Sequence, residues 1–303
     1  MQVSVIVSTR DRAADLARLL QSLSRCQVGP GREWELVLVD NGSSDDTPRV
    51  IEEFARTSPF RIVALREPRS GKSNALNTAL AHARGAILAF TDDDVIVTPD
   101  WIERIIDTFG QRPDLACAGG MVRLFNPEDA AISIRLATEE QTVDLSNFSA
   151  DCIPVMGCNM AVRADVCRQL GMFDPLLGPG CPIPAAEDLD FLYRLVRAGY
   201  RIGYVPSITV LHNHGRRTAQ QLDRLRANYL MGRGAFYAKQ ILARDRLVMR
   251  WARWECVPLL GWHWLGAFVS ARSRRCLGAL GWITRGAWRY LTCSMRQTAG
   301  RTA

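Results

Sequence analysis

Three consecutive carboxylates, Asp92, Asp93 and Asp94, directly follow the apolar run Ile87–Phe90. Like charges this close raise each other's pKa unless a positive group lies among them. Hard divalent cations such as Mg2+ and Mn2+ prefer oxygen ligands and often share them with substrate phosphates. The apolar run Ile87–Phe90 is typical of a buried parallel strand, and open α/β sheets bind ligands at the carboxyl ends of their strands. The pattern therefore favours a metal site over a solvated acidic turn before a helix capped by Asp100.

The first part of the chain alternates apolar runs with helical patterns. The runs predict buried strands at Val3–Val7, Glu35–Asp40, Arg61–Leu65 and Ile87–Phe90. This alternation predicts an α/β fold with a doubly wound, mostly parallel sheet flanked by helices. The polar residues that follow each strand then meet at one edge of the sheet and indicate a nucleotide site: Thr9 to Arg12, Asp40, Gly71 with Lys72, and Asp92 to Asp94.

Two common nucleotide motifs are absent from the sequence. The segment Ser70–Ser73 resembles the end of a P-loop, but Arg66 stands where that motif needs its first glycine. No GxGxxG turn follows the first predicted strand, so a Rossmann dinucleotide site has no support. The sequence therefore argues against a Walker-type NTPase and against a dinucleotide enzyme.

A series of segments in a fixed order resembles family 2 of the glycosyltransferases, of the inverting GT-A type. The resemblance covers about residues 1–215 and implies a GT-A-like, Rossmann-type sheet, a nucleotide-sugar donor and a divalent metal ion. The segments that carry it are Val5–Arg10, Val39–Thr47, Gly71–Asn77, Gly85–Asp94, Gly157–Arg163, Phe173–Asp174 with Glu187–Asp190, and Gly199–Pro206 leading to His212.

The resemblance implies which residues hold the metal ion. Asp92 and Asp94 match the family's DxD pair, and His212 matches a metal-binding histidine that follows the catalytic base in the sequence. His212 and His214 form an HxH pair whose imidazoles would point the same way on a strand, so His214 is the second choice. We expect Mn2+ or Mg2+, and imidazole suits Mn2+ better.

The resemblance also implies the residues that bind the nucleotide sugar. Asp40 would accept a hydrogen bond from the nucleotide base, and Thr9 and Arg10 would line the base pocket. The donor sugar would be UDP-, dTDP- or GDP-linked. Lys72 would lie near the base or the diphosphate, unless it is simply a solvated residue in a helix-opening loop. At strand spacing, Asp93 would face away from its neighbours, toward the ribose or the sugar.

The pair Glu187-Asp188 provides the candidate catalytic base. Asp188 could take the proton from an acceptor hydroxyl as it attacks the anomeric carbon in line with the leaving group, which inverts that centre. The neighbouring Glu187 could raise the apparent pKa of the pair. Both residues could also cap the predicted helix Leu189–Ala198, and the two roles are compatible. The Gly- and Pro-rich segment 176–184 is predicted to form a loop beside the acceptor site.

The last part of the chain carries the basic charge. Residues 216–303 contain 17 Lys and Arg against three Asp and Glu, a net charge of +14, whereas 1–215 have a net charge of −7. Residues 219–250 predict one or two Arg-rich amphipathic helices, followed by two short Trp-bearing apolar stretches, Val257–Ala271 and Leu277–Trp288. Such stretches are short for a membrane span but suit helices at an anionic membrane surface. Packing on the domain or in an oligomer is the alternative, and nothing in the catalytic part supports nucleic-acid binding.

These patterns predict two parts and one activity. Residues 1–215 form the GT-A domain, with a nucleotide-sugar half at about 1–100 and an acceptor half at about 101–215, and residues 216–303 form a helical C-terminal extension. We predict a glycosyltransferase that moves a sugar to a hydroxyl of a glycan or lipid-linked acceptor at the cytoplasmic face of the cell membrane. The alternatives are a catalytically silent sugar-nucleotide- or glycan-binding module and a sugar nucleotidyltransferase; Ser8–Arg12 lacks the glycine-rich loop that the latter needs.

Overall fold

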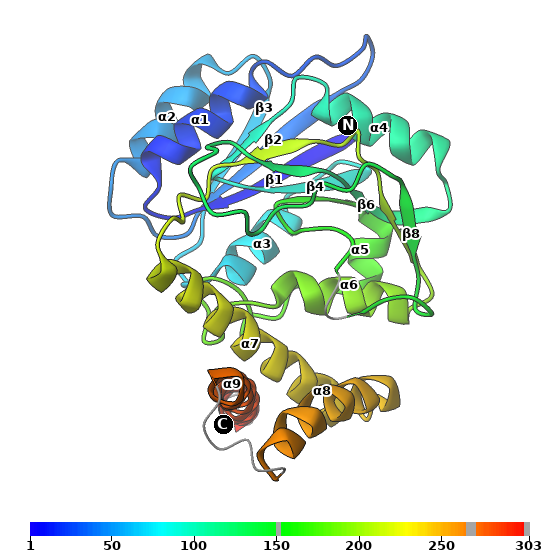
Figure 1. Ribbon diagram of the computed structural model, residues 1–303. Coiled ribbons are helices and arrows are strands. Elements are labelled where there is room, and N and C mark those ends of the chain that lie inside the picture. Colours follow the sequence, from blue (N-terminus) through cyan, green and yellow to red (C-terminus); the bar gives the residue numbers. More distant parts are fainter. Residues whose placement is uncertain (150–152, 265–270, 300–303) are drawn as a thin grey trace. The chain divides into compact units, whose positions relative to one another are not determined.

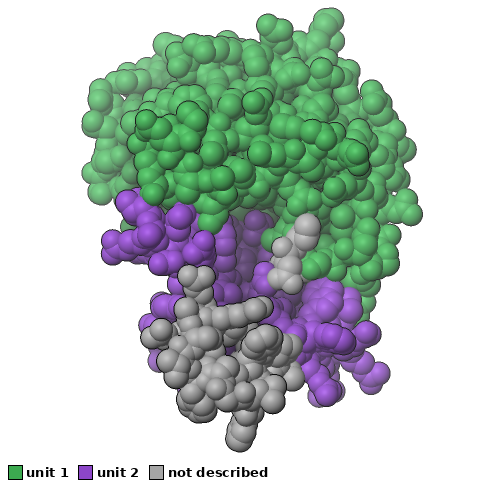
Figure 2. Space-filling model, viewed as in Figure 1, with its two compact units in different colours: residues 1–173, 191–217 green, residues 174–190, 218–303 purple. Residues whose placement is uncertain are grey.

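The chain divides into two compact units (Figure 2). The computed structural model describes residues 1–149, 153–264 and 271–299, without the side chains of 257–264, 271–277 and 298–299. Unit 1 comprises Met1–Phe173 and Phe191–Arg217, and unit 2 comprises Asp174–Asp190 and Thr218–Ala303. The segment 174–190 is therefore grouped with the C-terminal part of the chain and not with the residues that flank it in sequence.

Unit 1 is built on an eight-stranded sheet in the order β3-β2-β1-β4-β9-β6-β10-β8 (Figure 1). Its first four strands in that order are mutually parallel, whereas β9 is antiparallel to both of its neighbours. The α/β class and the mostly parallel sheet are therefore confirmed. The strands are β1 (Val3–Thr9), β2 (Trp34–Asp40), β3 (Arg61–Arg66), β4 (Ile87–Asp92), β6 (Leu115–Gly119), β8 (Gln141–Val143), β9 (Asn159–Arg163) and β10 (Arg201–Tyr204).

A second, three-stranded sheet lies at the end of β4. It has the order β5-β11-β7, formed by β5 (Val95–Val97), β11 (Val210–His212) and β7 (Val122–Leu124). β5 begins right after the acidic triplet and pairs antiparallel with β11, so that His212 lies opposite Val95. This pairing brings residues that are far apart in sequence to the end of the apolar strand.

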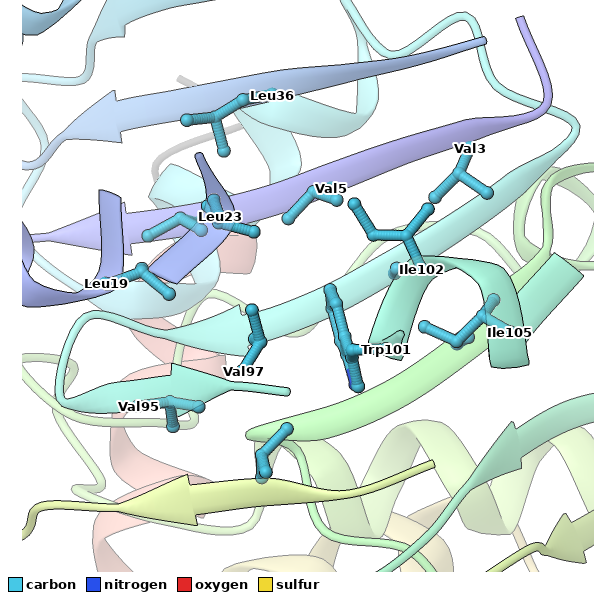
Figure 3. Packing of buried hydrophobic residues seen from close by; sticks show 14 of the residues in the cluster. Val3, Val5, Leu19, Leu23, Leu36, Val95, Val97, Trp101, Ile102 and Ile105 are labelled. Carbon is cyan, nitrogen blue, oxygen red and sulfur yellow. The ribbon is translucent and has the colours of Figure 1, made fainter. Parts of the chain in front are cut away.

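Helices cover both faces of the large sheet (Figure 1). On one face, buried apolar side chains of α1, α4, β1 and β2 belong to one cluster; Figure 3 shows Leu19 and Leu23 of α1, Trp101 of α4 and Val5 of β1 within it. The apolar residues recur at helical spacing, as expected for an amphipathic helix against a sheet. The helices of this unit are α1 (Ala13–Leu23), α2 (Thr47–Thr57), α3 (Lys72–Leu80), α4 (Trp101–Gln111), α5 (Ala164–Leu170) and the larger part of α6 (Glu187–Arg197).

Most of the described residues of unit 2 after residue 218 are helical. This unit contains α7 (Ala219–Leu242), α8 (Arg246–Trp264) and α9 (Ala271–Ala299), and Thr218 begins α7 with a capping box that it forms with Gln221. The predicted helices of 219–250 are confirmed. The predicted stretch Val257–Ala271 lies entirely outside the described side chains. Among the residues described here, no helix is both long enough and apolar enough to cross a membrane.

Close packing of α7 on α9 depends on two glycines. A Cβ atom on Gly286 would lie 1.9 Å from the carbonyl oxygen of Met231, and one on Gly234 would lie 1.9 Å from that of Ile283. These neighbours are backbone atoms, so the helices would have to separate to admit a side chain. Gly286→Val should therefore destabilise the protein by about 1–3 kcal/mol, the usual cost of overpacking.

Chemical denaturation followed by circular dichroism would measure this loss. Gly281 of the same helix has no atom within 4 Å of an added Cβ, so Gly281→Ala is the matched control. That change should leave stability unchanged or raise it by about 0.5–1 kcal/mol, because alanine is the better helix former. Equal stability of Gly286→Val and the wild type would contradict the packing of these two helices.

Candidate functional site

Strand register brings the predicted polar residues to one edge of unit 1. Thr9 at the end of β1 lies opposite Asp40 of β2, and Ser8 lies opposite Asp92 of β4. Parallel strands end at the same edge, so these side chains are neighbours although up to 83 positions separate them in sequence. The structure thus places Thr9, Asp40 and Asp92 at one site, as predicted.

Asn41 fixes the loop that leads to Lys72. Its amide nitrogen donates to the carbonyl oxygens of Glu67 and Arg69 at 2.9 and 2.7 Å, and its amide oxygen accepts from the Gly71 N–H at 2.8 Å. Gly71 has φ 122°, a conformation that side-chain-bearing residues rarely adopt. The buried Asp40 accepts the Ser43 N–H at 2.9 Å and so shapes the turn after its own strand.

Two cations flank this edge. The Lys72 ammonium, at the first turn of α3, donates to the Asp92 carboxylate. The half-exposed Arg10 donates to the Ser70 hydroxyl at 2.7 Å, which links β1 to the loop that precedes Lys72. Lys72 is therefore not simply solvated, since it neutralises one of the three carboxylates.

Asp93 is buried and contacts the last residue of β1 and an arginine of the loop that follows. The Thr9 hydroxyl donates to Asp93 Oδ2 at 2.8 Å, and Arg12 Nε lies 3.8 Å from Oδ1. Burial raises the pKa of Asp93 to about 7, although Arg12 opposes the shift. The predicted strand alternation does not apply here, because β4 ends at Asp92 and Asp93 lies in the turn to β5.

Asp94 lies between a guanidinium and an imidazole. Its Oδ2 lies 3.1 Å from Arg12 Nη1 and its Oδ1 lies 3.3 Å from His212 Nε2. Burial alone would raise its pKa, but the hydrogen bond and charge of His212, with the charges of Arg12 and Lys72, lower the pKa to about 2. In return, Asp94 raises the pKa of His212 against the effect of burial.

The environment of His212 fits a metal ligand. Its Nδ1 lies 3.2 Å from the carbonyl oxygen of Ser133, an acceptor that orients the ring and leaves Nε2 facing Asp94 Oδ1. A hydrogen bond from the other ring nitrogen to a backbone carbonyl is the usual way to present Nε2 to a metal. Two ligands bound at about 2.1 Å and at right angles are roughly 3 Å apart, close to the Asp94–His212 separation. The donor set therefore fits a divalent cation.

The third predicted ligand, Asp92, is not part of this pair. Asp92 is engaged with Lys72, so the structure joins only Asp94 and His212 of the three predicted ligands. In the described part of the chain, no three His, Cys, Asp or Glu side chains are already grouped around one point as a metal site. Asp92 would have to exchange Lys72 for the ion in order to bind it.

His214 lies in a different environment from His212. Its Nδ1 accepts the Arg216 N–H at 3.0 Å, and its Nε2 lies 3.2 Å from the Ala130 carbonyl oxygen. Burial, with the charges of His212 and Arg216, lowers the pKa of His214. Both ring nitrogens are thus occupied by backbone groups, and β11 ends at His212, so the two rings do not share a strand face. His214 contacts the backbone of the loop that contains Ala130 and does not face Asp94.

The predicted catalytic pair belongs to unit 2. α6 begins at Glu187, so that Glu187 and Asp188 occupy its first turn, where acidic residues are stabilised by the helix dipole. Asp188 Oδ1 accepts the Leu189 N–H at 2.8 Å. Ala186, directly before the pair, has φ 77°, a strained conformation for a residue with a Cβ. Backbone strain of this kind concentrates at functional sites.

Comparison with known proteins identifies the family. The model of "Glycosyl transferase family 2" matches residues 4–171, more than half of the chain. The chain belongs to this family. It is 27% identical to glycosyltransferase AglE of Haloferax volcanii over 82% of this chain and 76% of that protein. It is 29% identical to the pre-mycofactocin glycosyltransferase of Mycobacterium tuberculosis over 70% of this chain, which spans only 43% of that relative.

A solved structure confirms the fold. The mannosyltransferase PcManGT of Pyrobaculum calidifontis, in complex with GDP-Man and Mn2+, superimposes with a TM-score of 0.64 over 96% of this chain and 87% of that one, at 19% identity. The protein is thus a glycosyltransferase of GT-A fold, and its structural neighbours bind nucleotide sugars. The family assignment leaves no support for a nucleotidyltransferase or a silent binding module.

Sequence reasoning missed Arg12. Its guanidinium contacts both Asp93 and Asp94 and is the positive group that an isolated acidic triplet requires. The signal was present, because Arg12 lies within the polar run after the first strand. Only the pairing of β1 with β4 shows which of the two arginines in that run reaches the carboxylates.

Proposed function

We propose that this glycosyltransferase is metal-dependent and inverting, and that it moves a sugar from a nucleotide sugar to a hydroxyl of a glycan or lipid-linked acceptor of the cell envelope. The Asp94–His212 pair carries the proposal. It combines a carboxylate and an oriented imidazole nitrogen 3.3 Å apart, at the sheet edge where α/β folds bind ligands. The Mn2+ in the PcManGT structure is consistent with this assignment.

The donor is held by residues of the same edge. Asp40, Thr9 and Arg10 bind the base and ribose side, with Asp93 near the sugar. Lys72 exchanges its bond to Asp92 for a diphosphate oxygen when the ion is present. A divalent ion held by Asp92, Asp94 and His212 would neutralise the charge that develops on the departing diphosphate. UDP-, dTDP- and GDP-sugars all present the diphosphate that this cluster recognises.

Asp188 is the proposed base. It accepts the proton of the acceptor hydroxyl as that oxygen attacks the anomeric carbon from the face opposite the nucleotide, which gives inversion. The carboxylates of Asp188 and of the neighbouring Glu187 both lie in the first turn of α6, directly after the strained Ala186.

Calorimetry with nucleoside diphosphates tests the donor site. UDP, GDP, dTDP and CDP are titrated with Mn2+ and with EDTA into the wild type and Asp92→Ala. One nucleotide should bind in a metal-dependent way, and Asp92→Ala should weaken that binding by about tenfold or more, because a carboxylate ligand is lost. If none of the four binds with Mn2+ present, the proposed donor site is wrong.

The C-terminal part is proposed to rest on the cytoplasmic surface of an anionic membrane. Unit 2 exposes large apolar side chains beside many arginines; they are Leu242, Met249, Trp254, Trp288 and Met295. Trp and Arg in this combination favour the headgroup region: apolar area gives affinity, and the +14 net charge of residues 216–303 attracts anionic lipid. This location supports a lipid-linked or envelope acceptor.

Vesicle sedimentation tests this location with the full chain. The protein should sediment with vesicles that contain phosphatidylglycerol and much less with neutral phosphatidylcholine vesicles. Trp254→Ser with Trp288→Ser should weaken binding by about tenfold, because two exposed rings no longer insert. Met172→Ser removes an exposed apolar side chain of unit 1 and is the control that should change nothing. Equal affinity for both kinds of vesicle would refute an electrostatic membrane surface.

A further inference from the structure

One lysine joins the two ends of the segment that carries Glu187 and Asp188. Asp174 begins this segment and Asp190 ends it. Nζ of Lys239, on α7, lies 2.8 Å from Asp174 Oδ2 and 2.9 Å from Asp190 Oδ2. The sequence contains only two lysines, and the other, Lys72, contacts the donor-site carboxylate Asp92.

The remaining oxygen atoms of both carboxylates are also bound within unit 2. Asp174 Oδ1 accepts the Leu176 N–H at 3.0 Å, and its Oδ2 accepts the Tyr290 hydroxyl of α9 at 3.0 Å. Gln240, next to Lys239, donates to Asp190 Oδ1 at 3.2 Å. The side chains of Asp174 and Asp190 are 12% and 1% exposed, so removing their shared cation leaves two poorly solvated like charges.

The segment between these ends packs on the same helices. Leu176, Leu177 and Ile183 form a buried cluster with apolar residues of α7 and α9. The Ile183 N–H donates to the Leu176 carbonyl oxygen at 2.9 Å, and the Gly178 N–H donates to the Ile183 carbonyl oxygen at 2.9 Å. The segment is thus a closed loop with its own hydrogen bonds, held by α7 and α9.

α7 also supports the strained turn before the catalytic pair. A Cβ on Gly232 would lie 2.9 Å from Ala185 Cβ and 3.0 Å from Ala186 Cβ, so the glycine lets the turn approach the helix. Ala186 keeps its positive φ only where its surroundings hold it there. Gly232 is seven positions before Lys239, about two helical turns, so both contacts lie on one side of α7.

We propose that Lys239 is a positioning residue of the glycosyl transfer. By binding Asp174 and Asp190 together, it closes the loop 174–190 and fixes the first turn of α6, from which Asp188 projects. The C-terminal extension is then part of the catalytic machinery in addition to any role at a membrane. The catalytic consequence rests on the proposed function of Asp188, whereas the effect on the loop does not.

Hydrogen–deuterium exchange of the full chain tests the loop directly. Lys239→Met should speed amide exchange in peptides from 175–186 by about tenfold or more, because the two carboxylates repel once unpaired. Arg226→Met is the matched control, since Arg226 lies on the same helix and pairs with Asp223 on the exposed surface. Unchanged exchange in 175–186 in a folded Lys239→Met protein overturns the proposal.

A milder variant provides a second test if Lys239→Met does not fold. Tyr290→Phe removes only the hydroxyl that donates to Asp174 and should raise exchange in the same peptides by a smaller factor. Exchange in the peptides of unit 1 should stay at the wild-type rate in both variants. If Tyr290→Phe and Lys239→Met both leave the loop as slow as in the wild type, Lys239 does not hold it.

Kinetics separate positioning from donor binding. Lys239→Met should lower kcat by about tenfold or more while the Kd of the nucleoside diphosphate stays within about twofold, and Lys239→Arg should recover part of kcat because it restores the cation. An unchanged kcat despite faster exchange overturns positioning. If Asp188→Asn proves active, the assignment of the base is wrong, but the exchange experiment still decides whether Lys239 closes the loop.

Discussion

Asp94→Asn should almost abolish metal-dependent donor binding and sugar transfer. The substitution keeps the shape of the side chain but removes the charge that pairs with His212 and Arg12. An amide oxygen is a weaker ligand for a divalent cation than a carboxylate, and the Arg12 guanidinium would then repel the ion. We expect the affinity for the nucleoside diphosphate with Mn2+ to fall by about 100-fold and kcat/KM by roughly 1,000-fold.

A matched change at the opposite end of the sheet controls for lost stability. Glu35 is a fully buried carboxylate at the start of β2, bound by the Ser4 hydroxyl at 2.7 Å and by Arg61 Nε at 3.0 Å. Glu35→Gln should lower the unfolding midpoint and leave the Mn2+-dependent Kd unchanged. If Asp94→Asn binds the nucleotide as the wild type does, Asp94 is not a metal ligand, and its pairing with His212 is structural.

The parallel half of the fold could be predicted because its strands are buried on both faces. Runs such as Val3–Val7 have no polar face, so their hydrophobicity alone indicates a central strand. The antiparallel strand β9 was not predicted as a neighbour of β4, because its position depends on a partner more than 60 residues away. The grouping of 174–190 with α7 was missed for the same reason, because Lys239 contacts Asp174 although the two residues are far apart in sequence.

The site was predictable where strand register sets it. Thr9, Asp40 and Asp92 all end neighbouring parallel strands, and the structure places them together. Contacts of flexible side chains carry no such signal. Lys72 could reach several groups at this edge, and its bond to Asp92 appears only in three dimensions. The two histidines of the HxH pair look equivalent in sequence, but only His212 belongs to β11 and contacts Asp94.

The second large effect is expected for the proposed base. Asp188→Asn should lower kcat by roughly 100- to 10,000-fold, the usual contribution of a general base, because an amide cannot accept the proton of the acceptor hydroxyl. The N-terminal position in α6 tolerates asparagine, whose oxygen can still accept the Leu189 N–H. The fold and the donor site should therefore stay intact, and calorimetry should give the wild-type Kd for the nucleoside diphosphate.

Glu187→Gln distinguishes the roles of the two carboxylates. It removes one charge from the same helical turn but leaves Asp188 able to accept a proton, so kcat should fall by at most about tenfold. NMR of the product formed by the wild type should show an inverted anomeric centre, because a base without a covalent intermediate allows only one displacement. Retention of configuration, or turnover by Asp188→Asn close to that of the wild type, would show that Asp188 does not act as the base. The first turn of α6 would then have only the capping role that its acidic residues also suit.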